Sequence, residues 1–113
     1  MSQTRPLPNE VLTALVPVFR KYAVRRAILF GSFARGEATR HSDVDILATV
    51  ETPKRFFDRY DGILADLGRA LPGVGVDLLL YAPAELQAIS HRLFIRRALG
   101  EGQVIYESDE IAA

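Results

Sequence analysis

Residues 29–47 read LFGSFARGEATRHSDVDIL, and this stretch combines two features that decide how the chain folds. Gly31 and Ser32 follow directly after one apolar run, and Asp43 and Asp45 stand at the start of a second one. An apolar run that ends at a glycine is typical of a short buried strand. The stretch therefore predicts two strands joined by one loop, with a glycine-serine turn after the first strand and two aspartates at the start of the second.

The two aspartates have the spacing of a cation site. Side chains alternate across a strand, so Asp43 and Asp45 would point to one face while Val44 and Ile46 point to the other. Two carboxylates held side by side repel each other unless a cation lies between them. Oxygen ligands suit a hard divalent ion such as Mg²⁺. Taken alone, Asp43 would be better explained as a cap or turn residue.

The glycine-serine turn offers a different kind of binding. It exposes backbone N–H groups, and the missing β-carbon of Gly31 lets an anion approach closely. A helix that begins at Ser32 or Phe33 would add a favourable dipole, and Ser32 could also serve as its N-cap. One stretch thus combines a phosphate cradle with a metal platform, which suits a metal-bound nucleoside triphosphate.

The motif GSFARG at 31–36, followed by SDVDI at 42–46, resembles the signature of the minimal nucleotidyltransferases. These form the smallest branch of the DNA polymerase beta-like superfamily, and the resemblance covers most of the chain. It implies an α/β (α+β) nucleotidyltransferase fold, with a mixed sheet of three to four strands and helices packed mainly on one face. It also implies a third carboxylate on a later strand. Asp77, within VGVDLLL at 74–80, fits that place, since a charge among apolar neighbours is costly unless it is paired or bound to metal.

The resemblance assigns the metal ions to the three aspartates. It implies that Asp43, Asp45 and Asp77 bind two Mg²⁺ ions. One ion would hold the triphosphate of ATP and its leaving pyrophosphate, and the other would activate the attacking hydroxyl. Asp77 would act on the side of the nucleophile.

The resemblance assigns the phosphates to the glycine-serine turn. Ser32 would donate its hydroxyl and its backbone N–H to a phosphate, and Gly31 would allow close approach. Arg35 could contact phosphate as well, although pairing with a carboxylate that braces the loop is the simpler explanation for it.

The family also suggests a function. The resemblance implies transfer of AMP from ATP, or more generally of a nucleoside monophosphate, to a hydroxyl acceptor. Minimal nucleotidyltransferases are commonly paired with small helical HEPN proteins, often ribonuclease toxins, so we expect an antitoxin whose acceptor is a tyrosine, serine or threonine of such a partner. Two alternatives stay open. One is a catalytically silent antitoxin that acts by binding alone, and the other is a stand-alone enzyme that modifies a small molecule.

Length and composition set the outer bounds. The 113 residues, of which 49% are hydrophobic and 25% charged, predict one globular domain at 1–113. A net charge of zero argues against nucleic acid as the main partner. The absence of cysteine excludes disulfides and thiolate metal sites. Without a membrane-length apolar run or a signal-peptide pattern we expect a cytoplasmic location, and the oligomeric state is left open.

The whole chain predicts alternating helices and strands. Apolar spacing and turn residues predict helices at 9–22 (with a kink at Pro17), 32–35, 52–71 and 83–100, strands at 25–30, 43–50, 74–81 and 103–107, and a frayed tail at 108–113. Leu93 and Leu99 count among the periodic apolar residues of the last helix. Strand parity places Leu79 and Tyr81 on the face of Asp77. That face is expected either to stay partly open for a partner or to be covered by a local helix.

Overall fold

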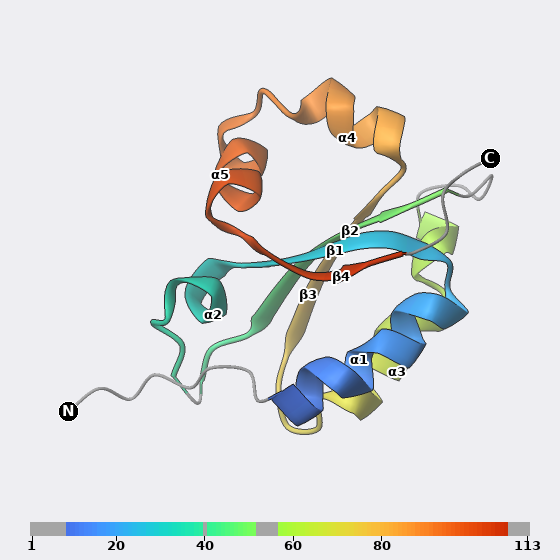
Figure 1. Ribbon diagram of the computed structural model, residues 1–113, viewed down its shortest axis with the longest axis vertical. Helices are drawn as coiled ribbons and strands as arrows, with labels where there is room; N and C mark the ends of the chain where they lie inside the picture. The colour runs from blue at the N-terminus through green and yellow to red at the C-terminus, as the bar shows by residue number, and fades with distance from the viewer. Residues whose placement is uncertain (1–8, 40, 52–56, 109–113) are drawn as a thin grey trace.

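The fold is built on a mixed four-stranded sheet with the strand order β3-β2-β1-β4 (Figure 1). The computed structural model describes residues 9–39, 41–51 and 57–108. The strands are β1 (Val24–Phe30), β2 (Val44–Val50), β3 (Val76–Tyr81) and β4 (Gln103–Glu107). Strand β1 pairs antiparallel with β2 and β4, and β2 pairs parallel with β3. The predicted α+β class, the mixed sheet and all four predicted strands are therefore confirmed.

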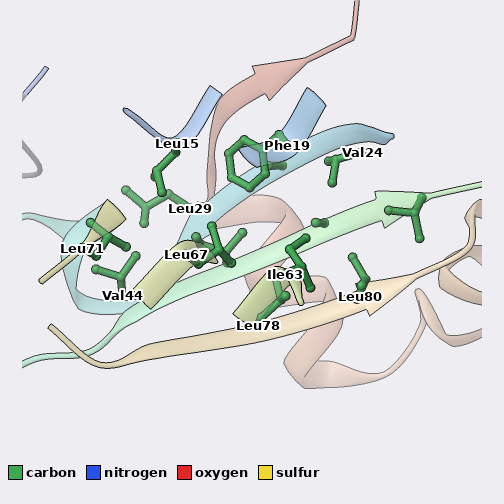
Figure 2. Packing of buried hydrophobic residues seen from close by; sticks show 14 residues of the cluster. Leu15, Phe19, Val24, Leu29, Val44, Ile63, Leu67, Leu71, Leu78 and Leu80 are labelled. Carbon is green, nitrogen blue, oxygen red and sulfur yellow. The ribbon is translucent and has the colours of Figure 1, made fainter. Parts of the chain in front are cut away.

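The larger core lies on the face of the sheet that α1 (Asn9–Lys21) and α3 (Ile63–Ala70) cover (Figures 1 and 2). Leu15 and Phe19 of α1 are fully buried there, because their spacing places both on one side of the helix. Pro17 lies inside α1 on its exposed side, and the helix continues past it, so the proline does not break the helix. The larger of the two buried clusters thus lies on this face of the sheet.

Two further helices lie on the opposite face of the sheet, α4 (Pro83–Ile89) and α5 (Leu93–Glu101) (Figure 1). A second, smaller cluster of buried residues forms beneath them, made of Ile28, Phe30, Leu47 and Ala98, with Leu79 and Tyr81 packed against it. The open face considered from the sequence is therefore wrong, and the alternative of a local helix cover is confirmed. The physical reason is that the strands carry apolar side chains on both faces, and each face needs a cover.

The predicted helix at 52–71 is not continuous. Its expected start at 52 lies outside the described residues, and its remainder is divided into the 3-10 helix η1 (Phe57–Tyr60) and α3. Between them Gly62 has a φ of +83°, a conformation that only glycine adopts readily. A β-carbon at Gly62 would also overlap the hydroxyl oxygen of Tyr22 and would lie 3.4 Å from Cζ of the tyrosine ring. Gly62 is the N-cap residue of α3.

The predicted helix at 83–100 is divided as well. Residues 90–92 separate α4 from α5, and the Ser90 hydroxyl donates to the Gln87 carbonyl at 2.9 Å at the end of α4. The break changes which residues of α5 are buried. Ile95 and Ala98 face the core, while Leu93, expected in the apolar stripe, is 71% exposed.

A short helix and a loop connect β1 to β2. Helix α2 (Gly31–Arg35) begins directly at the end of β1 and ends at Gly36, whose φ is +72°. The loop that follows is held by its own hydrogen bonds, among them the Thr39 amide donating to the Ser42 hydroxyl at 2.9 Å. Strand β2 then begins at Val44, one residue after Asp43.

The end of the described chain stays attached to the sheet. The Ser108 amide donates to the carbonyl of Arg25 at 2.9 Å, so the expected fraying does not begin at Ser108. The rest of the predicted tail, 109–113, lies outside the described residues. Across residues 9–39, 41–51 and 57–108 we find no helix with the length and apolar character of a membrane span.

Candidate functional site

The register of the sheet brings two of the predicted aspartates together. Asp45 of β2 lies opposite Asp77 of β3 in the parallel pair, and Phe30 of β1 lies opposite Asp45 on the other side. Alternation along the strands places both carboxylates on the face that α4 and α5 cover. Asp43 precedes β2 by one residue and is exposed. The sheet thus aligns side chains that are far apart in the sequence.

Two glycines make room for the carboxylates. A β-carbon on Gly31, whose φ is +74°, would lie 3.1 Å from Cγ of Asp45 and overlap its Oδ2. A β-carbon on Gly75 would lie 3.0 Å from Cγ of Asp43 and overlap its Oδ1. The sequence predicted that Gly31 leaves room for an anion, but it did not show that the Asp45 carboxylate uses this space.

The carboxylates repel one another. Burial raises the pKa of Asp45 to about 6, and a hydrogen bond to Asp77 and the negative charges of Asp77 and Asp43 act in the same direction. The Arg35 guanidinium opposes this rise in the pKa. Without a bound cation, a proton therefore reduces the repulsion between Asp45 and Asp77.

The donor set of these residues fits Mg²⁺. Its donors are carboxylate oxygens whose mutual repulsion a divalent cation would remove. Within residues 9–39, 41–51 and 57–108, no three His, Cys, Asp or Glu side chains converge as a ready-made metal cluster. Mg²⁺ does not require one, because it commonly keeps several waters and is held by one or two carboxylates together with substrate phosphates.

A cavity of about 710 Å³ opens above the paired aspartates. Its lining includes four of the predicted site residues, namely Gly31, Arg35, Asp45 and Asp77. The volume lies in the range of small-molecule and cofactor sites. The two remaining predicted residues, Ser32 and Asp43, do not line the cavity. Ser32 directly follows Gly31, and Asp43 lies two residues before Asp45, and both of those residues do line it.

Ser32 and Arg35 differ in how well they match their expected roles. Phe30 and not Ser32 is the N-cap residue of α2, so the N-cap explanation for Ser32 is wrong.

The Arg35 side chain donates to Glu37 at 2.6 Å and approaches Glu101 of α5 at 3.7 Å. These contacts raise the pKa of Arg35, with the hydrogen bond to Glu37 as the largest cause. Arg35 therefore braces the loop, as the simpler explanation held, while it also lines the cavity.

The sequence did not predict the wall of the cavity that α5 supplies. Phe94, Arg97, Ala98 and Glu101 line it. Their spacing in the sequence already indicated that they share one side of a helix. The spacing alone did not predict that this side faces a cavity, because the expected uninterrupted helix at 83–100 would turn a different set of residues toward the core.

Comparisons with known proteins match most of the chain to one family. A family profile described as "Polymerase beta, Nucleotidyltransferase" matches residues 13–111. In Methanocaldococcus jannaschii, "Putative protein adenylyltransferase MJ1305" is 37% identical over 87 residues, which cover 73% of this chain and 58% of that protein. "Putative protein adenylyltransferase MJ0128" of the same organism is 44% identical over 63 residues, 53% of this chain and 59% of that protein. The chain thus spans somewhat more than half the length of these relatives.

Solved structures share the fold at low sequence identity. A chain in the crystal structure of a toxin–antitoxin with AMP-PNP superposes with a TM-score of 0.66 at 20% identity, covering 87% of this chain and 74% of that one. A chain of the MntA–HepT toxin–antitoxin gives a TM-score of 0.61 at 16% identity, over 89% and 74%. A third match is to a chain in the structure of a tri-AMPylated Shewanella oneidensis HEPN toxin in complex with MNT antitoxin. It has a TM-score of 0.57 at 17% identity and covers 87% of this chain and 71% of that one.

Proposed function

The chain belongs to the polymerase beta nucleotidyltransferase family, and on that premise we propose that it transfers AMP from ATP, with Mg²⁺, to a hydroxyl group of a protein partner. The observation that carries the proposal is the parallel register of β2 and β3. It sets Asp45 beside Asp77 at the base of a cavity that Gly31 also lines. Carboxylates for a metal and a turn open to phosphate thus meet in one place.

The residues that line the cavity, together with Asp43 and Ser32 beside it, would divide the reaction between them. Mg²⁺ held by these carboxylates would neutralise negative charge on the triphosphate and lower the pKa of the attacking hydroxyl. Asp43 and Asp45 would hold the nucleotide side of the site, and Asp77, on the neighbouring strand, the acceptor side. Ser32 would donate to a phosphate oxygen, and Gly31 would let the phosphate chain approach the backbone.

The transfer itself is a displacement at the α-phosphorus. The acceptor oxygen forms a bond to the α-phosphorus, and the bond from that phosphorus to the oxygen that bridges to the β-phosphate breaks. Pyrophosphate leaves with the bonding electrons, and the hydroxyl proton passes to solvent. The role of the protein is to hold the acceptor oxygen in line with the breaking bond.

We propose a helical HEPN-type protein as the acceptor, with a tyrosine hydroxyl as the atom that is modified. Two observations support this. One of the solved structures with a chain that shares this fold is a complex of a tri-AMPylated HEPN toxin with an MNT antitoxin. In addition, the zero net charge of the chain makes nucleic acid a poor default acceptor, because affinity for nucleic acid rests largely on cationic contacts. The chain would then act as an antitoxin in the cytoplasm.

The test is to co-express the protein with a HEPN-type partner from the same genome and to measure the mass of the partner. The expected result is a partner heavier by one or more AMP groups, and this gain should be lost in Asp43→Asn. Asp61→Asn is the matched control, because Asp61 is exposed in the turn before α3 and away from the cavity.

Two other results would overturn the proposal in different ways. An unmodified partner in a tight complex would indicate a silent antitoxin that acts by contact alone. Label from ATP that appears only in small molecules would indicate a stand-alone enzyme.

A further inference from the structure

Helix α5 presents one face to the cavity, and that face changes in chemistry along its length. Phe94, Arg97 and Glu101 line the cavity at intervals of three and four residues, which places them on one side of the helix. Ala98, which also lines the cavity, belongs to the buried cluster formed with residues of β1 and β2, so it packs α5 against the sheet. The cavity therefore has a helical wall opposite the strands that carry the aspartates.

The Glu101 end of this wall lies next to the glycine-serine turn. Arg35 of α2 reaches across to Glu101, with 3.7 Å between Arg35 Nη1 and Glu101 Oε2. Gly31, at the start of α2, lines the same cavity. The phosphate-binding turn and the C-terminal part of α5 are thus neighbours.

The opposite end of the wall carries an exposed aromatic ring. Phe94 is 59% exposed, and it meets Phe30 edge to face with 5.7 Å between the ring centroids. Phe30 is in turn the residue that lies opposite Asp45 in the sheet. Phe94 and Glu101 are seven positions apart in α5, a distance of about 10 Å along the helix axis.

Arg97 lies between these two ends. Among residues 9–39, 41–51 and 57–108 it makes no ion pair, whereas Arg35 makes two. Arg97 lines the same cavity as Asp45 and Asp77 but pairs with neither of them, so its guanidinium is available to a bound anion. Its planar guanidinium matches the geometry of phosphate oxygens.

We propose that α5 forms the second half of the nucleotide site, in which Arg97 contacts the phosphate chain and Phe94 stacks on the base. This inference rests on the proposed function. ATP then lies along α5, with its phosphates toward Gly31 and its base toward Phe94. A phenyl ring stacks on every base, so Phe94 adds affinity without selecting adenine.

The test measures dissociation constants of Mg²⁺–AMP-PNP and of Mg²⁺–tripolyphosphate by calorimetry. Arg97→Gln should weaken binding of both ligands about tenfold or more, since it removes a charge-assisted contact to phosphate. Phe94→Leu should weaken AMP-PNP about fivefold or more and leave tripolyphosphate unchanged, since only AMP-PNP has a base. Phe94→Tyr keeps the ring and should bind AMP-PNP as the wild type does.

Two matched controls come from the same helix. Arg96 is exposed and Leu93 is 71% exposed, and neither lines the cavity. Arg96→Gln and Leu93→Ala should therefore leave both dissociation constants unchanged.

The possible failures are distinguishable. If the wild type binds AMP-PNP but Arg97→Gln and Phe94→Leu behave like the controls, the inference is overturned and the proposed function stands. Equal weakening of both ligands by Phe94→Leu would show that Phe94 acts by packing on Phe30, which overturns the base contact. A wild type that binds no AMP-PNP in the presence of Mg²⁺ would overturn the proposed function, and the inference with it.

Discussion

Gly31 and Asp45 pack so closely that a β-carbon on the glycine would lie 3.1 Å from Cγ of the aspartate and overlap its Oδ2. The glycine of the predicted phosphate turn therefore also shapes the carboxylate site. Gly75, which directly precedes β3, has the same close contact with Asp43, which directly precedes β2. The two halves of the sequence motif form one packed unit, and a change in one half is expected to disturb the other.

Gly31→Ala should abolish nucleotide transfer, because the new methyl group displaces the Asp45 carboxylate. Gly36→Ala is the matched control, since Gly36 has a similar φ of +72° but no other atom within 4 Å of the new carbon. Both variants should lose stability by about 1–2 kcal/mol from backbone strain alone. Only Gly31→Ala should lose transfer, as followed by labelled AMP on the acceptor. Equal rates in the two variants would contradict the packing argument.

Asp45→Asn should stabilise the metal-free protein above about pH 6 and leave it unchanged near about pH 4. Burial and Asp77 raise the pKa of Asp45 in the folded state from 3.8 to about 6. The folded state therefore binds the extra proton in this window, and the stability of the wild type falls as the pH rises through it. The amide avoids this cost, which is on the order of 1 kcal/mol for a half-buried carboxyl after solvent screening.

Thermal unfolding in a chelator across this pH range checks the prediction for Asp45→Asn. Added Mg²⁺ should reverse the order by stabilising the wild type alone, and transfer should be lost in the variant. A difference in stability that does not vary with pH would contradict the assigned pKa.

Ser32→Ala should raise the dissociation constant of Mg²⁺–ATP about tenfold or more, because it removes a charge-assisted hydrogen bond to phosphate. Its effect on folding should be small, since Ser32 is not the cap of α2. Ser42→Ala is the complementary control. Its hydroxyl accepts the Thr39 amide at 2.9 Å, so its loss should lower stability and spare nucleotide affinity. Calorimetry together with unfolding measurements separates the two effects.

Tyr22→Phe should lower the free energy of unfolding by about 1–2 kcal/mol without changing nucleotide affinity. The Tyr22 hydroxyl donates to Asp66 at 2.6 Å, and Lys21 pairs with the same carboxylate at 2.8 Å. These contacts join the end of α1 to α3, on the face of the sheet away from the cavity. Urea unfolding measures the effect, and a loss of AMP-PNP binding would contradict the separation of the two faces.

The sequence by itself determined the four strands and the turn that carries Gly31. It also indicated Asp43, Asp45 and Asp77 as candidate metal ligands. Each of these conclusions depends on residues that are close together in the chain. Alternation of apolar and polar side chains, a glycine at the end of an apolar run and a charge within one can all be read locally. The parallel register of β2 and β3 then placed Asp45 opposite Asp77, which the alternation of side chains within each strand does not determine.

Only the tertiary structure decided which helices end early and which face they cover. At the break between η1 and α3, Gly62 lies so close to Tyr22, far from it in the sequence, that a β-carbon would overlap the tyrosine hydroxyl. The position of α5 on the sheet brings Phe94 and Arg97 to the cavity and Glu101 to Arg35. Helical spacing specifies which residues share a side of a helix, but packing against the sheet decides where that side points.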